Sequence, residues 1–332
     1  MIPSLARVLR RLPLGARKDA ASQPLRLARG ATDWAGGRRS LPAVFLDRCA
    51  NSGCDRVRGV SSLQLRLRPG RLLEGMWYCG PECWEDAAHE RLAGLIETSQ
   101  RARVPQHRVP LGLLMLSRGD ITAAELNAAL AAQRQTGEGR IGEWLRHMGA
   151  ASEEQVTAAL GQQWSAPLLT LRSSTAGTGS RLLPVALMEA CRVLAVHWNA
   201  STRTLLTAFV DGIDYATLFS MQQALECEAE AGIISESGFE RQITQIRQTA
   251  RAREVGIRTP VDRAEMVRVL GNYCHRVDAV GARLFGCRKT LWARLDTPRG
   301  WFDVTFPCPE PAPNVPDAQT GEADYRRRGL SL

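Results

Sequence analysis

The sequence predicts an α+β protein made of several small units. Three observations lead to this class. Four cysteines in two close pairs flank strand-forming residues, a helical pattern is written twice at an offset of 30 residues, and residues 181–306 alternate helix and strand patterns. We expect a small zinc finger, an all-α tandem helical-hairpin subdomain, a small α/β subdomain and a C-terminal α+β unit, in that order along the 332 residues.

The net charge of +9 is concentrated at the N-terminus, where residues 1–42 carry nine basic side chains against Asp19 and Asp33. This segment shows no sustained period, so we expect a disordered basic tail. Such an arm also suits nucleic acid or anionic lipid. No apolar run approaches the roughly 18 residues that span a bilayer, which predicts a cytoplasmic protein without membrane insertion.

Residues 43–97 contain four of the nine cysteines, with the spacing Cys49-x4-Cys54, then 24 residues, then Cys79-x3-Cys83. Two close pairs around a strand-rich spacer are typical of a tetrahedral thiolate zinc site. The second pair opens a predicted helix with Pro81 in its first turn. Buried free thiols are the alternative. A zinc ion held by four thiolates would be structural, because it leaves no coordination position for water.

This arrangement of a knuckle, a hairpin and a helix start resembles treble-clef zinc fingers. His89 lies beyond the second cysteine pair on the same helix, and we expect it at the surface rather than at the metal.

Residues 107–171 carry the repeat. Each copy predicts a short helix, a glycine that ends it (Gly119 or Gly149), and a longer helix that opens with a capping box, Thr122-x-x-Glu125 or Ser152-x-x-Gln155. Two helical hairpins of this kind should pack into a compact all-α unit.

The second copy, Arg140-Ile141-Gly142-x-x-Leu145-x3-Gly149-x5-Gln155-Val156-x-x-Ala159-Leu160-x-x-Gln163, resembles the tandem motif of the GspE N-terminal (MshEN) domain. That domain precedes the motor of type II secretion and type IV pilus assembly ATPases. The similarity covers roughly residues 108–250.

The resemblance implies cyclic di-GMP binding, since pilus-type members of the family bind this ligand through the tandem motif. Arginine supplies a donor fork for a phosphate or a guanine edge, and glycine lets the backbone approach closely at a helix start. In the first copy Pro110 replaces the expected arginine, and Arg108 is the nearest substitute; in the second, Ala150 and Ala151 replace larger aliphatic residues. The implied ligand-binding positions are Arg108, Leu111, Gly112, Gly119, Leu130, Gln133, Arg140, Ile141, Gly142, Leu145, Gly149, Leu160 and Gln163.

Two further units follow. Residues 181–250 alternate helix and strand patterns as a small α/β subdomain, and residues 256–306 predict a helix followed by two or three strands with a turn at 297–300. Cys274, His275, Cys287 and Cys308 lack ligand spacing and are expected in the core or as incidental residues. Residues 307–332 are rich in proline and polar residues, which predicts a second disordered tail.

No catalytic motif is visible. The only lysines are Lys18 and Lys289, and neither follows a glycine, so the Gly-Lys-Ser/Thr loop of an ATPase is missing. We therefore expect a non-enzymatic regulatory or adaptor protein. Two alternatives stay open: a pure docking module for a secretion or pilus assembly protein, and a nucleic-acid binder built from the finger and the basic tail. The second is disfavoured by the near absence of aromatic residues among the basic ones.

Overall fold

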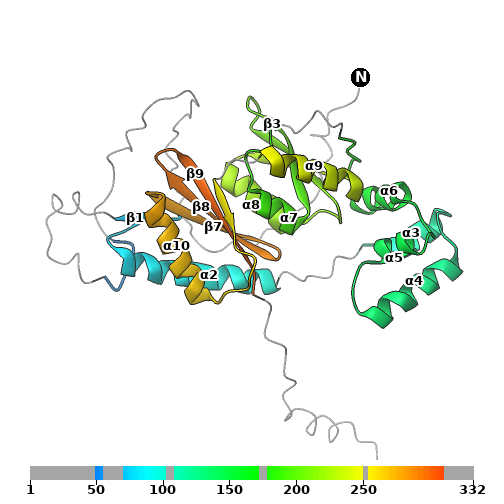
Figure 1. The fold of residues 1–332 in the computed structure, drawn as a ribbon, viewed down its shortest axis with the longest axis horizontal. Coiled ribbons are helices and arrows are strands. Elements are labelled where there is room, and N and C mark those ends of the chain that lie inside the picture. Colours follow the sequence, from blue (N-terminus) through cyan, green and yellow to red (C-terminus); the bar gives the residue numbers. More distant parts are fainter. Residues whose placement is uncertain (1–48, 55–69, 102–107, 172–177, 250–252, 310–332) are drawn as a thin grey trace, which may run out of the picture. The chain divides into compact units, whose positions relative to one another are not determined.

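The structure, a computed structural model, describes residues 49–54, 70–101, 108–171, 178–249 and 253–309 (Figure 1). The predicted tail at 1–42 lies outside these residues, as do residues 310–332 of the C-terminal tail predicted at 307–332; the first residue of that tail, Pro307, instead ends the last strand. The described elements confirm the α+β class. In the described part of the chain, no helix is long and apolar enough to cross a membrane.

A six-stranded sheet combines the cysteine-rich segment with the C-terminal segment, in the order β2-β1-β7-β8-β9-β6. The first segment supplies β1 (Arg71–Leu73), β2 (Met76–Tyr78) and α2 (Pro81–Arg101); the second supplies β6 (Glu254–Gly256), α10 (Arg263–Arg276), β7 (Gly281–Cys287), β8 (Thr290–Thr297) and β9 (Gly300–Pro307).

Parallel pairing of β1 with β7 joins the two segments. Leu72 lies opposite Gly281, and its backbone N–H donates to the carbonyl of Val280 at 3.0 Å. Helix α2 packs on α10 and on β7 (Figure 1). Trp84 of α2 shares one apolar core with Leu270 and Phe306. The expected finger (43–97) and C-terminal unit (256–306) therefore share one sheet and one core over their described residues.

The tandem subdomain consists of α3 (Leu111–Ser117), α4 (Ala123–Thr136), α5 (Ile141–His147) and α6 (Glu153–Trp164). The predicted caps form as expected. Thr122 and Ser152 accept from the backbone N–H of Glu125 and Gln155, whose side chains bond back to the cap residues. Gly119 (φ +75°) and Gly149 (φ +71°) adopt the left-handed conformation that follows a short helix.

The two copies of the repeat interlock. Helix α3 of the first copy packs chiefly on α6 of the second, and α5 of the second packs chiefly on α4 of the first. All four helices contribute to one core that includes Met115, Leu126, Leu145 and Val156. The copies therefore form the compact all-α unit that the sequence predicted, with each short helix packed chiefly on the long helix of the other copy.

The α/β subdomain alternates helices and strands, as the sequence predicted. Its elements are α7 (Val185–Cys191), β3 (Val193–Asn199), β4 (Thr204–Phe209), α8 (Tyr215–Leu225), β5 (Glu228–Ile233) and α9 (Glu236–Thr249). The sheet order is β3-β4-β5; β3 and β4 are antiparallel, whereas β4 and β5 are parallel. After α6 the chain runs along β5, where the N–H of Leu169 donates to the carbonyl of Ile233 at 2.7 Å. The end of the tandem subdomain is thereby attached to this sheet.

A buried ion pair lies where the α/β subdomain meets the large sheet. Arg294 and Asp303 are 2% and 3% exposed, and the guanidinium Nε and Nη2 atoms donate to the two carboxylate oxygens at 2.9 Å each. Arg294 also donates to the carbonyl of Leu182, and the indole N–H of Trp292 donates to Asp303. Each charge is thus surrounded by partners, as a buried charge requires.

Candidate functional site

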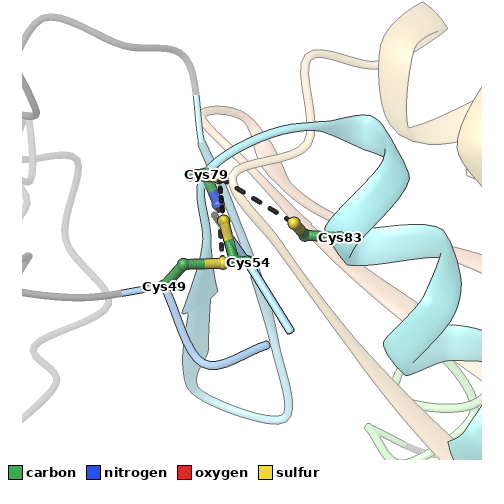
Figure 2. Close-up of side chains that lie close together, drawn as sticks. All are labelled: Cys49, Cys54, Cys79 and Cys83. Atoms are coloured by element: carbon green, nitrogen blue, oxygen red, sulfur yellow. Dashed lines mark hydrogen bonds between the residues drawn. The ribbon is translucent and has the colours of Figure 1, made fainter. Parts of the chain in front are cut away.

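The four predicted metal ligands come together. The Sγ atoms of Cys49, Cys54, Cys79 and Cys83 all lie within 4.8 Å of one another (Figure 2). The Sγ of Cys79 is 3.4 Å from that of Cys54 and 3.9 Å from that of Cys83. Sulfur atoms at the corners of a tetrahedron with Zn–S bonds of about 2.3 Å are about 3.8 Å apart, so the cluster has the size of a thiolate metal site.

Local backbone contacts hold the cluster together. The turn after Cys49 is closed by Asn51, whose side-chain oxygen accepts from the N–H of Gly53 at 2.9 Å. The N–H of Ala50 donates to the carbonyl of Trp77 in β2, which fixes the turn against the hairpin. Cys79 follows the hairpin, and Cys83 lies in the first turn of α2 (Figure 2).

Burial favours the neutral thiols in the absence of a cation. Burial, together with hydrogen bonds from Cys54 and Cys49, raises the pKa of Cys79 to about 11, and the same causes raise the pKa of Cys83. A bound cation reverses this preference, because a coordinated thiol is deprotonated. Four sulfur donors at these separations therefore fit a metal ion. His89 is not part of the group.

A second site is a pocket of about 200 Å³ between the second motif copy and the α/β subdomain. Its α/β wall is formed where the parallel strands β4 and β5 end, a position at which open α/β sheets commonly bind ligands. The lining residues are Leu111, Arg140, Ile141, Gly142, Glu143, Arg146, Glu153, Val156, Thr157, Leu160, Gln163, Val210, Asp211, Ile234 and Glu236.

Ion pairs cross this pocket. Arg140 Nη1 lies 3.2 Å from Asp211 Oδ2, and it donates to the carbonyl of the same residue at 3.1 Å. Arg146 donates to Glu236 at 2.8 Å, and the N–H of Ser237 donates to Glu153 at 2.7 Å. The second copy is thus attached to the α/β subdomain by charged contacts.

Six of the thirteen positions implied by the motif line the pocket: Leu111, Arg140, Ile141, Gly142, Leu160 and Gln163. Five come from the second copy, and only Leu111 comes from the first. The structure thus brings the second half of the predicted site together, but gathers almost none of the first half there.

Most of the remaining positions have structural roles. Leu145 is fully buried, Leu130 packs against the same helical core, and Gly119 and Gly149 follow the short helices. Gly112 lies against α4: a Cβ atom there would be 2.5 Å from Cδ1 of Leu126.

Gly142 has the equivalent role in the second copy, where a Cβ atom would be 3.0 Å from Cγ1 of Val156. We expected the motif glycines to open the backbone to an anion. In the structure they allow two helices to cross closely, and the N–H of Arg140 is already bonded to Glu143.

Arg108 does not reach the pocket. Its guanidinium carbon lies 3.6 Å from the centre of the Trp164 ring, and its Nη1 donates to the carbonyl of Gln163 at 3.1 Å. Arg108 therefore does not substitute for the arginine that the motif has at the position of Pro110.

The polar wall of the pocket was not predicted from the sequence. Asp211 and Glu236 come from the α/β subdomain, and Arg146 and Glu153 come from the second copy. The two residues within the repeat carried a usable signal, because the first copy has Leu116 and Ala123 at the equivalent positions. A charge present in only one copy marks a contact that only that copy makes.

Comparisons with known proteins give matches among solved structures. No family model and no curated protein matches the sequence. Among solved structures, the chain is similar to MshE with cdg, at 26% identity and a TM-score of 0.35 over 43% of this chain and 100% of that chain. It is also similar to the N-terminal domain of XpsE, at 15% identity and a TM-score of 0.35 over 43% of this chain and 98% of that chain. With these TM-scores, the resemblance rests on the motif residues.

Proposed function

We propose that this protein is a non-enzymatic, cytoplasmic regulatory or adaptor protein that binds cyclic di-GMP at the second copy of its tandem motif. One observation carries the proposal: six positions of the motif converge on one pocket beside the ends of β4 and β5. The ligand follows from the resemblance of the motif to secretion and pilus ATPase N-terminal domains. The absence of a Gly-Lys-Ser/Thr loop from the sequence supports a regulatory rather than a motor role.

The chemistry of the pocket suits a nucleobase. Leu111, Ile141, Val156 and Leu160 supply apolar walls, and Arg140 supplies hydrogen-bond donors at the edge. Recognition sites for small molecules combine a mostly apolar lining with a few placed polar groups in this way.

For the cysteine cluster we propose a structural zinc ion. Four thiolates close a tetrahedral coordination shell and leave no open position for a substrate or a water molecule. The cluster lies beside β1 and α2, which belong to the core of the large sheet. The metal would therefore stabilise the unit as a whole.

Isothermal titration calorimetry of the full chain tests the binding proposal. Cyclic di-GMP should give a saturable heat that Arg140→Ala abolishes. Arg134→Ala removes an exposed guanidinium from α4, outside the pocket, and should bind as the wild type does. Absence of heat at high micromolar ligand, or an Arg140→Ala titration identical to that of the wild type, would refute the proposal.

A docking module is the second candidate, and an exposed apolar surface on the first copy favours it. Val109 and Leu113 are 58% and 52% exposed and flank Pro110 at the start of α3. A secretion or pilus assembly protein that co-purifies without nucleotide, and is lost on Leu113→Asp, would support docking; retention of that partner by the variant would argue against it.

A further inference from the structure

We infer that the pocket is a half-site: it takes one guanine base, so that a guanine mononucleotide binds about as tightly as the cyclic dinucleotide. This inference rests on the proposed nucleotide-binding function and specifies which part of the ligand is recognised. It follows from the differences between the two copies, the size and charge of the pocket, and the donors and acceptors at its edge.

The repeat itself is nearly symmetric. Gln133 lies in the last turn of α4 and donates to the carbonyl of Gly139 at 2.8 Å, and Gln163 lies in the last turn of α6 and donates to the carbonyl of Val109 at 2.7 Å. Positions 109 and 139 are equivalent at the repeat offset of 30 residues. A ligand with two identical halves could therefore meet two equivalent sites if the side chains around them were also equivalent.

The side chains are not equivalent. The second copy places Arg140, Glu143, Arg146 and Glu153 around the pocket; the first copy has Pro110, Leu113, Leu116 and Ala123 at the same positions. Every charged group of the second copy's pocket is thus replaced by an apolar residue. The first copy retains the helices of the motif but has no polar group at these positions that could recognise a base.

The size of the pocket suits one base. Its volume of about 200 Å³ is below the roughly 300–1,000 Å³ of pockets that enclose drug-sized ligands. A planar purine is the part of a guanine nucleotide that apolar walls accommodate best, because the sugar and the phosphate are strongly hydrated.

The charge of the pocket also favours a base over a phosphate. Four carboxylates, of Glu143, Glu153, Asp211 and Glu236, line it beside the two guanidinium groups of Arg140 and Arg146. A third guanidinium, that of Arg192, pairs with Asp211 at 3.0 Å and with Glu236 at 2.6 Å, so the carboxylates exceed the guanidinium groups by one. Like charges within a few ångströms repel each other. A phosphate is therefore disfavoured inside the pocket and remains outside, whereas a neutral base can enter.

The donors and acceptors match guanine. Arg140 uses Nη1 for Asp211, and among the described residues no partner is recorded for its Nε and Nη2. Arg140 and Arg192 both approach Oδ2 of Asp211. Among the described residues, Oδ1 of Asp211 is therefore open as an acceptor. An arginine fork suits O6 and N7 of guanine, and a carboxylate oxygen accepts from the N1–H and the amino group of the same base.

Adenine has the opposite pattern at two of these positions. It presents an amino donor where guanine has O6, and an acceptor at N1 where guanine has N–H. The amino group would face the arginine donors, and N1 would face the carboxylate. Sites built around specific hydrogen bonds reject such analogues strongly, so the pocket should distinguish the two purines.

The test is a set of titrations on the full chain, with cyclic di-GMP, GMP and AMP under identical salt and pH. We expect dissociation constants for GMP and cyclic di-GMP within about threefold of each other, and AMP at least tenfold weaker. GMP and AMP carry the same phosphate, so their difference reports on the base. Binding of AMP equal to that of GMP would overturn the assignment of guanine.

The outcomes separate this inference from the proposed function. If cyclic di-GMP binds but GMP is more than about thirtyfold weaker, the half-site is wrong and the proposed function stands. If neither ligand binds, the proposed function fails, and the half-site fails with it.

A variant of the first copy tests the half-site a second time and leaves the pocket unchanged. Leu113 is 52% exposed, so Leu113→Gln should leave the fold intact. With a half-site, the affinity for cyclic di-GMP is unchanged in this variant. A loss of cyclic di-GMP binding with unchanged GMP binding would show that both copies hold the ligand, and would overturn the inference.

Discussion

Gln133 and Gln163 each form a hydrogen bond that links the two motif copies. Each glutamine lies in the last turn of the long helix of one copy. Its side-chain amide donates to the carbonyl just before the other copy begins, at 2.8 Å to Gly139 and at 2.7 Å to Val109. The glutamine of the motif thus has a structural role in both copies, whatever binds beside it.

Substituting either glutamine should loosen this subdomain. We expect Gln133→Ala and Gln163→Ala to lower the free energy of unfolding by about 1 kcal/mol each, the usual net worth of a hydrogen bond. Gln135→Ala is the matched control, because Gln135 is exposed near the end of the same helix α4. Urea unfolding would measure the three values; a control as destabilised as the test variants would contradict the role of the two bonds.

The glycines that start the short helices should not tolerate alanine. A Cβ atom would lie 2.5 Å from Leu126 at Gly112 and 3.0 Å from Val156 at Gly142. Because overpacking typically costs about 1–3 kcal/mol, both variants should be destabilised, Gly112→Ala more than Gly142→Ala.

Gly94 provides the control for these substitutions. It lies within α2, and a Cβ atom there meets nothing within 4 Å. Gly94→Ala should therefore gain up to about 1 kcal/mol from helix propensity. Thermal unfolding would give all three values; equal behaviour of Gly94→Ala and Gly112→Ala would contradict the close helix crossing.

The buried pair between Arg294 and Asp303 should be sensitive to removal of one partner. Asp303→Ala leaves the guanidinium of Arg294 buried without its carboxylate, which typically costs about 3–5 kcal/mol. Arg268→Ala breaks an ion pair with Glu265 whose arginine side chain is 70% exposed, and should change stability by less than about 1 kcal/mol. Chemical denaturation would compare the two; similar losses would contradict the burial of the Arg294 pair.

Removing the metal should destabilise the large sheet and not only the cysteine turn. Strand β1 pairs with β7, and Trp84 of α2 lies in the core with Leu270. Loss of a structural metal is among the few changes that cost more than about 4 kcal/mol, so a chelator or Cys83→Ala should lower Tm markedly.

The control is Cys274→Ala, which removes a buried thiol far from the cluster in sequence. The free energy of unfolding should fall only by the small amount that follows from losing one small buried side chain and leaving a small cavity. Metal content by mass spectrometry, measured beside Tm, should read one zinc per chain. Equal stability with and without chelator would contradict a structural metal.

Local chemistry was readable from the sequence. The caps at Thr122 and Ser152, the cysteine cluster, and the elements of the α/β subdomain all depend on residues near one another in the chain. Cys274 and Cys287 are buried, as expected of cysteines without ligand spacing.

Long-range pairing was not readable. Strand β1 has three residues and pairs with β7, whose first residue is more than 200 positions later. Neither stretch contains a pattern that indicates its pairing partner. The packing of each short helix on the long helix of the other copy was not predicted for a similar reason. An amphipathic pattern shows which face of a helix is buried but not which helix covers it. Asp211 reaches the pocket only because β4 ends there, so a motif search within the repeat could not find it.

Hydrogen–deuterium exchange of the full chain, with and without saturating cyclic di-GMP, tests the location of the site most directly. We predict slower exchange in residues 140–163 and around Asp211, where the pocket lies, and unchanged exchange in residues 281–307 of the large sheet. Exchange that is unchanged throughout, or slowed only in the large sheet, would contradict a nucleotide site at the second motif copy.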